Sequence, residues 1–187
     1  MSAVQIGRLV LEPAAQRTDL LADSVSAALF EAAGHEESFA DVAVAEIDPE
    51  LADTAAFCAS YDVPLDISAN CVVVAGKREG EQRIAVCLVL ATSRADVNGV
   101  VKRRLDVRKA SFLSMDEAVD RTGMEYGGIT PVGLPADWPI LVDETVAELP
   151  WVIIGSGLRR SKIAIPGAAL AWLAGQGTGA VIPSLAR

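Results

Sequence analysis

The sequence predicts a single α/β domain built on a mixed β-sheet. Its length of 187 residues fits one domain. Short apolar runs typical of strands alternate along the chain with apolar residues at helical spacing. Many neighbouring strand candidates are joined by short links, which favours a mixed sheet over a doubly wound parallel one. Because no repeat, low-complexity tract or linker divides the chain, we expect one domain over residues 1–187, with an N-terminal strand and helix in residues 1–39.

The N-terminal third is predicted to alternate between extended segments and helices. Thr18 or Asp19 can cap the first helix, which Gly34 ends, and Asp53 or Thr54 can cap the second. Apolar and polar residues alternate in the strand between them. The predicted ranges are residues 6–11 (a strand or packed arm), about 20–33 (helix), 41–47 (strand) and 55–61 (helix).

The middle of the chain is predicted to form a β-hairpin flanked by short helices. Two apolar runs enclose the polar residues 76–82, and both runs are apolar enough to be interior strands. Asp96 or Asn98 then opens a basic helix, and Ser114 starts another helix with acidic residues in its first turn. The predicted ranges are residues 71–75 and 83–91 (strands), up to 104 (helix), 107–112 (strand) and 115–122 (helix).

The C-terminal third is predicted to be rich in strands. An acidic turn at Asp143 and Glu144 separates two of them. Pro166 suits the first turn of the last helix, which Gly175 ends. The predicted ranges are residues 140–142, 151–154 and 162–165 (strands), 167–173 (helix) and 177–187 (an extended tail).

The charge balance argues against binding nucleic acid by bulk attraction. Sixteen Lys and Arg stand against 25 Asp and Glu, which gives a net charge of −9. Basic residues nevertheless cluster in residues 102–109 and 159–162. Either these clusters are solvated surface, or they meet in space and contact a few phosphates of an RNA end. In the second case the contacts would include Lys102, Arg103 and Arg159.

The chain is expected to be cytoplasmic and not to enter a membrane. No apolar run approaches the ~18 residues of a spanning helix, and the N-terminal residues lack the basic and apolar blocks of a signal peptide. Cys58, Cys71 and Cys87 sit in apolar contexts and form no CxxC motif. They are interpreted as reduced core thiols, not as a disulfide framework.

No side-chain catalytic set is recognisable. The single histidine, His35, follows the first predicted helix, so a Ser-His-Asp triad and a histidine metal site have little support. Ser156 lacks the frame of a nucleophile elbow, and neither a Walker loop nor a dinucleotide fingerprint occurs. The sequence therefore predicts no metal and no cofactor. Backbone donors remain as the means to orient an ester carbonyl.

Two glycine-containing loops, residues 123–134 and 155–160, could provide those donors. The first holds four glycines and a proline together with apolar Ile129, Val132 and Leu134. Such a segment is either a structural connection or a binding loop, because glycine permits positive φ and close approach of a ligand to the backbone. If both loops line one pocket, they favour hydrolysis of an activated ester.

Residues 122–134 resemble the signature of the YbaK/EbsC family, aminoacyl-tRNA deacylases that include prolyl-tRNA editing domains. That signature reads Thr-Gly, three residues, Gly-Gly, Ile or Val, Ser or Thr, Pro, any residue and Gly-Leu, and the chain matches it in order. Spacing agrees over about residues 40–175. It includes the helix before Pro64, the hairpin at 70–91 and the late loop at 155–159 with its basic residue.

The resemblance implies a compact domain with a partly barrel-like sheet surrounded by helices. It implies hydrolysis of mischarged aminoacyl-tRNA at the tRNA 3′ end, with water as nucleophile and help from the substrate's hydroxyl groups. The backbone of one loop would meet the aminoacyl group and the other loop would face it. The implied contacts are Gly127, Gly128, Ile129, Thr130 and Pro131, with Gly155, Ser156 and Gly157 opposite.

One position departs from the family pattern. Where relatives usually carry a lysine at the start of the first hairpin strand, this chain has Asn70. Lys77 does not replace it, because it falls on the other face of an extended strand, about 23 Å along at ~3.3 Å per residue. Asn70 can donate a hydrogen bond to a carbonyl or a ribose but supplies no charge.

Three hypotheses follow. The first is a freestanding aminoacyl-tRNA deacylase of altered substrate range, with Asn70 and Gly128 in the catalytic positions. The second is a non-catalytic homologue that holds an amino acid, a nucleotide, an aminoacyl-tRNA end or a synthetase surface without turnover. The third is hydrolysis of another small ester or thioester.

Overall fold

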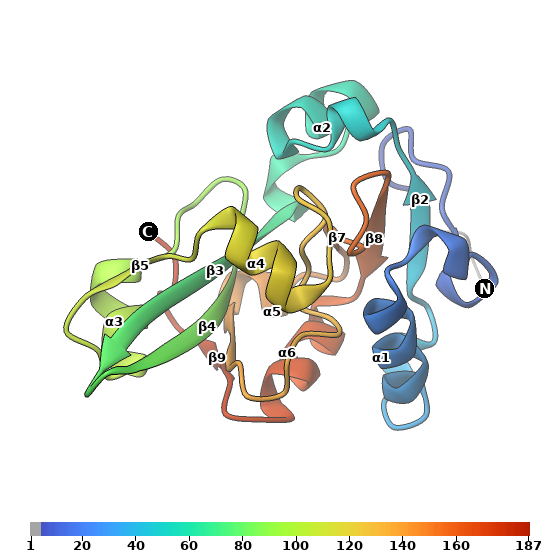
Figure 1. Ribbon diagram of the computed structural model, residues 1–187. Helices are drawn as coiled ribbons and strands as arrows, with labels where there is room; N and C mark the ends of the chain where they lie inside the picture. The colour runs from blue at the N-terminus through green and yellow to red at the C-terminus, as the bar shows by residue number, and fades with distance from the viewer. Residues whose placement is uncertain (1–4) are drawn as a thin grey trace.

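The strands form two β-sheets in the part of the chain that the computed structural model describes, residues 5–187 (Figure 1). Residues 1–4, part of the segment expected to lack a signal peptide, lie outside the described residues. One sheet has the strand order β1-β2-β8-β7 and is antiparallel throughout. The other has the order β5-β3-β4-β6-β9.

The five-stranded sheet is mixed. Strand β3 pairs antiparallel with β4 and β5, whereas β6 runs parallel to both β4 and β9. The strands are β1 (Glu12–Pro13), β2 (Ala43–Glu46), β3 (Ala69–Arg78), β4 (Glu81–Leu90), β5 (Ala110–Phe112), β6 (Ile140–Asp143), β7 (Val152–Gly155), β8 (Ser161–Ile165) and β9 (Ala180–Ile182).

Short helices surround the sheets. In Figure 1, α1 lies beside β2 and β8, α2 lies at the top of the molecule, α4 crosses in front of β3, and α6 lies below. The helices are α1 (Asp23–Ala33), α2 (Thr54–Tyr61), α3 (Lys102–Arg104), α4 (Met115–Thr122), α5 (Glu144–Ala147) and α6 (Gly167–Gly175).

The predicted mixed α/β class is confirmed, but its sheet is divided in two. The chain leaves β6 through α5 and enters β7 in the other sheet, so the two C-terminal strand candidates do not pair. A parallel bridge between Ser68 and Ile153 connects the sheets where β3 begins. Residues of β7 and β8 are buried throughout, so these two strands belong to the core.

Several predicted boundaries are wrong for identifiable reasons. The hairpin strands continue through residues 76–82 to a two-residue turn at Glu79 and Gly80, both with positive φ, because exposed polar residues can extend a paired ladder. Helix α1 begins at Asp23, after a 3₁₀ turn over Thr18–Leu20. The acidic turn after β6 contains α5, which the Asp143 carboxylate caps.

The N-terminal segment is a packed arm. Ile6 and Leu9 are buried beneath α2, and the Arg8 N–H donates to Tyr61 O at 2.7 Å. The first strand is Glu12–Pro13 only. No helix among residues 5–187 is long and apolar enough to cross a membrane.

Asp143 joins the end of β6 to the C-terminal segment. It is 2% exposed, and its carboxylate accepts hydrogen bonds from Thr145 N at 3.1 Å and Ala186 N at 2.8 Å. We expect Asp143→Ala to lower the free energy of unfolding by about 2 kcal/mol, because hydrogen bonds to a charged group are lost. Denaturant titration measures the change. Exposed Asp116→Ala is the control, and an equal loss in both variants would contradict this role.

Candidate functional site

The two glycine loops predicted from the sequence contact each other through their backbones. Glu125 N donates to Gly157 O at 2.8 Å, and Gly157 N donates to Gly128 O at 2.7 Å. The Glu125 side chain adds a third link, since it accepts from Arg159 N at 2.6 Å. The loop that follows α4 is therefore fixed against the loop that follows β7.

Glycine is required at this contact. A Cβ on Gly128 would lie 2.6 Å from the backbone carbonyl of Leu158, and one on Gly155 would meet the Gly128 carbonyl oxygen even more closely. Gly127 has φ 81°, a conformation that L residues rarely adopt. The glycines thus allow two backbones to touch, which leaves little room for a substrate between them.

A pocket of about 340 Å³ opens beside this contact, between β3, α4 and the start of α2. One side is polar and includes Asp53, Thr54 and two cationic side chains. The other side is apolar and consists mainly of Cys71, Val73, Leu113, Ala118 and Ile129. Exposed Phe112, Met115 and Tyr126 stand at its mouth.

Five of the predicted site residues line this pocket. They are Asn70, Gly127, Ile129, Gly155 and Arg159. Among residues 5–187, the backbone N–H groups of Gly127 and Ile129 donate to no protein acceptor, and both residues line the pocket.

The other loop residues predicted to contact substrate lie elsewhere. The Gly128 N–H donates to Glu125 O at 2.9 Å within a turn, so it is not free to meet a substrate, and Gly128 is in van der Waals contact with Leu158. Thr130, Ser156 and Gly157 are buried in the packing behind the pocket. Pro131 faces a different cavity.

Ser156 has a structural environment. Its hydroxyl lies 2.8 Å from the Ser161 hydroxyl, which donates to Leu20 O at 2.7 Å. These bonds tie the late loop to the segment before α1. The buried Thr130 hydroxyl has no hydrogen-bond partner among the described residues.

Asn70 lines the pocket, and one end of its amide is bound to Thr54. The Thr54 hydroxyl donates to Asn70 Oδ1 at 2.8 Å, which occupies the carbonyl end of the amide. The Asn70 Nδ2 group has no acceptor among residues 5–187 and is left to donate to a ligand.

The second cation in the pocket, Lys162, was not among the predicted site residues. It lies on β8, where its Nζ donates to Ala52 O at 3.1 Å and to Gly127 O at 3.4 Å. The ring of Phe57 packs against the ammonium, with 5.4 Å from Nζ to the ring centroid. Lys162 is only 8% exposed, although it lines the pocket.

Burial lowers the pKa of Lys162 to about 8 from its ordinary 10.5. The pKa of Lys162 is raised in part by the nearby Cys58 and Asp53 and lowered further by Arg159. In the same pocket, burial raises the pKa of the Cys71 thiol. The ammonium is therefore close to its titration point near neutral pH, whereas the thiol is a weak acid.

The sequence around Lys162 contains a signal that its side chain is part of a site. Lys162 is the one charged residue in a strand of otherwise small and apolar residues, Ser161–Ile165, all of them buried. In the sequence it belongs to a basic cluster with Arg159 and Arg160, for which either a solvated surface or contact with phosphates is expected. Only the neighbouring strands show that its side chain points into the protein.

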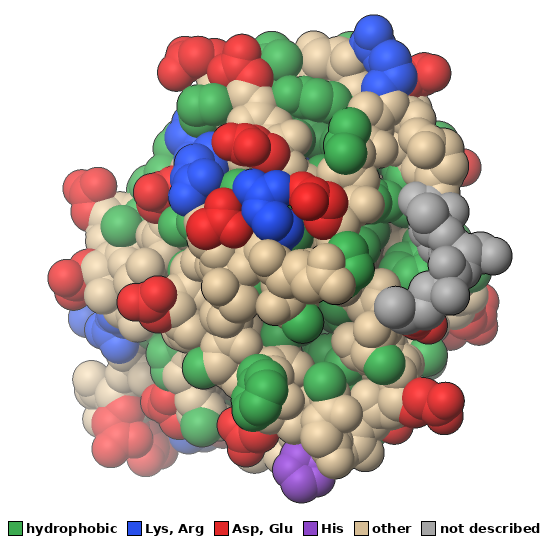
Figure 2. All heavy atoms as spheres, turned by 90° about the vertical axis from the view of Figure 1, so that its right-hand side faces the viewer, with side chains coloured by type: hydrophobic (Ala, Val, Ile, Leu, Met, Phe, Trp, Pro, Cys, Tyr) green, Lys and Arg blue, Asp and Glu red, His purple; other side chains and the backbone are tan. Residues whose placement is uncertain are grey.

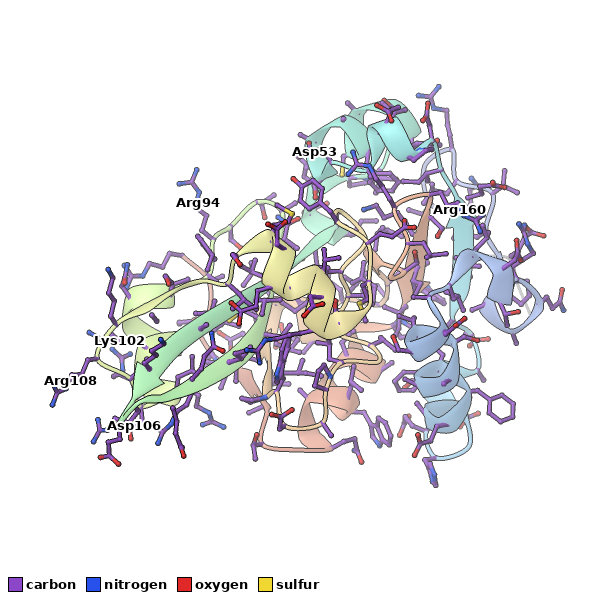
Figure 3. The ribbon with its side chains drawn as sticks, in the orientation of Figure 1. Asp53, Arg94, Lys102, Asp106, Arg108 and Arg160 are labelled. Carbon is purple, nitrogen blue, oxygen red and sulfur yellow. The ribbon has the colours of Figure 1, made fainter. Side chains whose placement is uncertain are left out.

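The two basic clusters do not meet. Lys102 and Arg108 lie at one end of the molecule and Arg160 at the other, with Asp53 between them at the top (Figure 3). Lys102 and Arg103 belong to α3 and line no part of the pocket. On the face formed by α1 and β2, basic side chains are flanked by acidic ones (Figure 2). Arg17 also forms a salt bridge with Asp19.

A larger cavity of about 520 Å³ lies on the opposite side of the loop, between α1 and α6. It is lined mostly by apolar side chains, including Trp138 and Trp172, and its ionisable residues are Glu31 and His35. We favour the smaller pocket as the site because free hydrogen-bond donors and cations converge there. Among the described residues no cluster of His, Cys, Asp and Glu could hold a metal.

Comparisons with known proteins identify the family and the fold of the chain. The model of a family described as the aminoacyl-tRNA editing domain matches residues 48–173. The uncharacterized protein YwhH of Bacillus subtilis (strain 168) is 33% identical over 85 residues, which are 46% of this chain and 52% of that protein. The chain thus spans about half the length of this curated relative.

Solved structures share the fold. A proposed trans-editing enzyme for prolyl tRNA synthetase superimposes with a TM-score of 0.68 at 22% identity, over 86% of this chain and 97% of that one. The hypothetical protein APE2540 gives 0.65 at 19% identity, over 77% and 90%. These likenesses establish the architecture.

Gly128→Ala tests the backbone contact between the loops. Since the new methyl group would overlap Leu158, we expect the free energy of unfolding to fall by about 1–3 kcal/mol, as overpacking typically does. Thermal and denaturant unfolding measure this. Gly175→Ala, with no heavy atom within 4 Å of its Cβ, is the matched control. Equal stability of both variants would rule out the tight contact.

The pKa of Lys162 predicts a pH-dependent stability. Because its folded pKa of about 8 is below 10.5, the unfolded chain binds more protons between these values and stability rises with pH. We expect wild type to gain up to about 3 kcal/mol relative to Lys162→Met between neutral pH and pH ~10. Denaturant unfolding across that range measures the difference. Exposed Lys77→Met should leave the pH dependence as in wild type, and a constant difference for Lys162→Met would contradict the assignment.

Proposed function

Because the chain belongs to the aminoacyl-tRNA editing domain family, we propose that it hydrolyses the ester of mischarged aminoacyl-tRNA as a freestanding deacylase. The observation that carries the proposal is the pocket beside the Gly127–Ile129 turn, which is lined by backbone and side-chain hydrogen-bond donors. Its partner is the 3′ end of an aminoacyl-tRNA.

Water is the nucleophile in this proposal. The candidate side chains in the pocket are poorly suited to attack, because the Cys71 thiol has a raised pKa and the Thr54 hydroxyl is engaged with Asn70. Water adds to the ester carbonyl carbon, the bond to the ribose oxygen breaks, and that oxygen takes up a proton. The products are a free amino acid and a tRNA with its terminal hydroxyl restored.

The shape of the pocket favours a small acyl group. Its apolar side is closed by Val73, Leu113 and Ala118, and the whole pocket must also admit the terminal ribose. Alanine, serine, threonine and cysteine are therefore the first substrates to consider. Serine, threonine and cysteine would bring a polar group to the boundary between the apolar and polar sides.

The mouth of the pocket suits the end of a nucleic acid. Tyr126 and Phe112 are 56% and 65% exposed, and flat exposed rings can stack on unpaired bases. Arg159 lies over the Tyr126 ring, with 5.5 Å from its Cζ to the centroid, and can meet a terminal phosphate. With a net charge of −9, contact with the rest of a tRNA is expected to be limited.

Deacylation assays test the function. We expect the protein to release at least one of these four amino acids from a mismatched tRNA about 100-fold faster than spontaneous hydrolysis, given the usual effect of a positioned donor. Asn70→Ala should slow release, because it removes the free amide donor. Lys77→Met changes the same strand outside the pocket and should retain the wild-type rate.

Two results would redirect the interpretation. Ester loss at the background rate across the panel would exclude a deacylase for these amino acids. Thermal stabilisation by a non-hydrolysable aminoacyl-adenosine analogue without turnover would instead indicate a binding module. That role is considered because Asn70 stands where relatives usually carry a lysine.

A further inference from the structure

Lys162 is a buried cation that forms no salt bridge with the described residues. Among residues 5–187 no carboxylate lies within 4.0 Å of its Nζ, and the side chain is 8% exposed. Burial of an ammonium that lacks an anionic partner is unfavourable. A residue of this kind that lines a pocket is a candidate for ligand binding, since a negative group on the ligand would offset the cost.

The surroundings of Lys162 leave one N–H group of its ammonium without an acceptor among the described residues. An ammonium has three N–H groups, and Ala52 O and Gly127 O accept two of them at 3.1 and 3.4 Å. The Phe57 ring covers another side of the group. These contacts anchor Nζ at the polar side of the pocket, where Asn70 Nδ2 is also without an acceptor among the described residues.

We propose that Lys162 donates its remaining N–H to the carbonyl oxygen of the scissile ester and stabilises the negative charge that develops there. The inference rests on the proposed function. As water adds to the carbonyl carbon, the carbonyl π electrons move to this oxygen, which becomes an oxyanion. They return when the bond to ribose breaks, so Lys162 keeps its proton throughout. It is a catalytic residue in this role, because it touches the reacting atom.

The ester oxygen fits this position better than other acceptors of the substrate. The acyl side chain is matched to the apolar side, formed by Cys71, Val73 and Ile129. A phosphate is larger and strongly hydrated, and Arg159 at the more open rim is its natural partner. The ester carbonyl joins these two parts of the substrate, so it lies near the boundary where Lys162 and Asn70 converge.

A cation in this place makes the reaction depend on pH. The ionisable groups around Lys162 are Asp53 before α2, Cys58 on α2, Tyr126 on the loop after α4, and Arg159 on the loop after β7. Burial raises the pKa of the Cys58 thiol, so that group titrates above its ordinary range. Loss of the Lys162 proton near pH 8 would remove the charge that assists the reaction.

The test compares Lys162→Met and Lys162→Gln with wild type and with Lys77→Met. Single-turnover and steady-state deacylation are measured between pH 6.5 and 9, after subtraction of spontaneous hydrolysis. We expect kcat to fall about 100-fold or more with KM changed less than about threefold, as for other oxyanion donors. Wild-type kcat should decline above pH ~8 and the residual rates of the variants should not. Lys77→Met should keep the wild-type decline.

Each outcome decides between roles. Unfolding measurements confirm that the variants are folded, and Lys162→Met and Lys162→Gln can be judged separately if one is not. A rate within about threefold of wild type in a folded variant would overturn the proposal. A variant that raises KM alone would place Lys162 in ground-state binding and would also overturn it.

Binding separates failure of this inference from failure of the proposed function. An adenosine carrying a phosphonate in place of the ester mimics the oxyanion, and isothermal titration measures its affinity. If wild type has no deacylase activity, the proposed function fails, yet binding that is lost in Lys162→Met and kept in Lys77→Met would still support recognition of an anionic oxygen by Lys162. Equal affinity of wild type and Lys162→Met would overturn it.

Discussion

The contact between the two glycine loops is the constraint on which the site depends. Gly128 and Gly157 are linked backbone to backbone, and a side chain on Gly128 or Gly155 would force the two loops apart. This contact positions the Gly127 carbonyl where it accepts a hydrogen bond from Lys162. The N–H groups of Gly127 and Ile129, which line the pocket, donate to no acceptor among residues 5–187. One short segment thereby connects the core, the pocket wall and the buried cation.

The distribution of charge separates the pocket from the rest of the surface. The protein is acidic overall, and acidic and basic side chains are interspersed on the face around α1 and β2 (Figure 2). Within the pocket, Lys162 and Arg159 oppose a single carboxylate, that of Asp53, which also caps α2. The cation at the base is buried and the cation at the rim is half-buried. This difference in burial between the two cations suits a ligand with an electron-rich group at the base of the pocket and a phosphate at its rim.

The site also shows how the same sequence feature can have two structural uses. We expected both glycine loops to face a substrate across a cleft. Instead they pack on each other, and only part of each loop reaches the pocket, namely Tyr126, Gly127, Ile129, Gly155 and Arg159. The glycine content of residues 123–134 correctly predicted that another group would come close to this backbone. That group is largely the backbone of the second loop and not a substrate. The position of Asn70 in the pocket followed from strand spacing and from the family pattern, because β3 is long and regular.

Local patterns in the sequence determined the mixed α/β class, most strands and helices, and the cap at Ser114, because these depend on residues close together in the chain. They also narrowed two further caps to neighbouring candidates, of which the structure uses Asp53 and Asp96. The division into two sheets, the separation of the basic clusters and the direction of Lys162 depend on contacts between distant segments. Lys162 meets Ala52 and Gly127, which are 110 and 35 residues away along the chain. A lysine in a short strand has the same local sequence whether its side chain is solvated or buried. Only the packing of α2 and the glycine loop around β8 decided that it is buried, and made it part of the pocket.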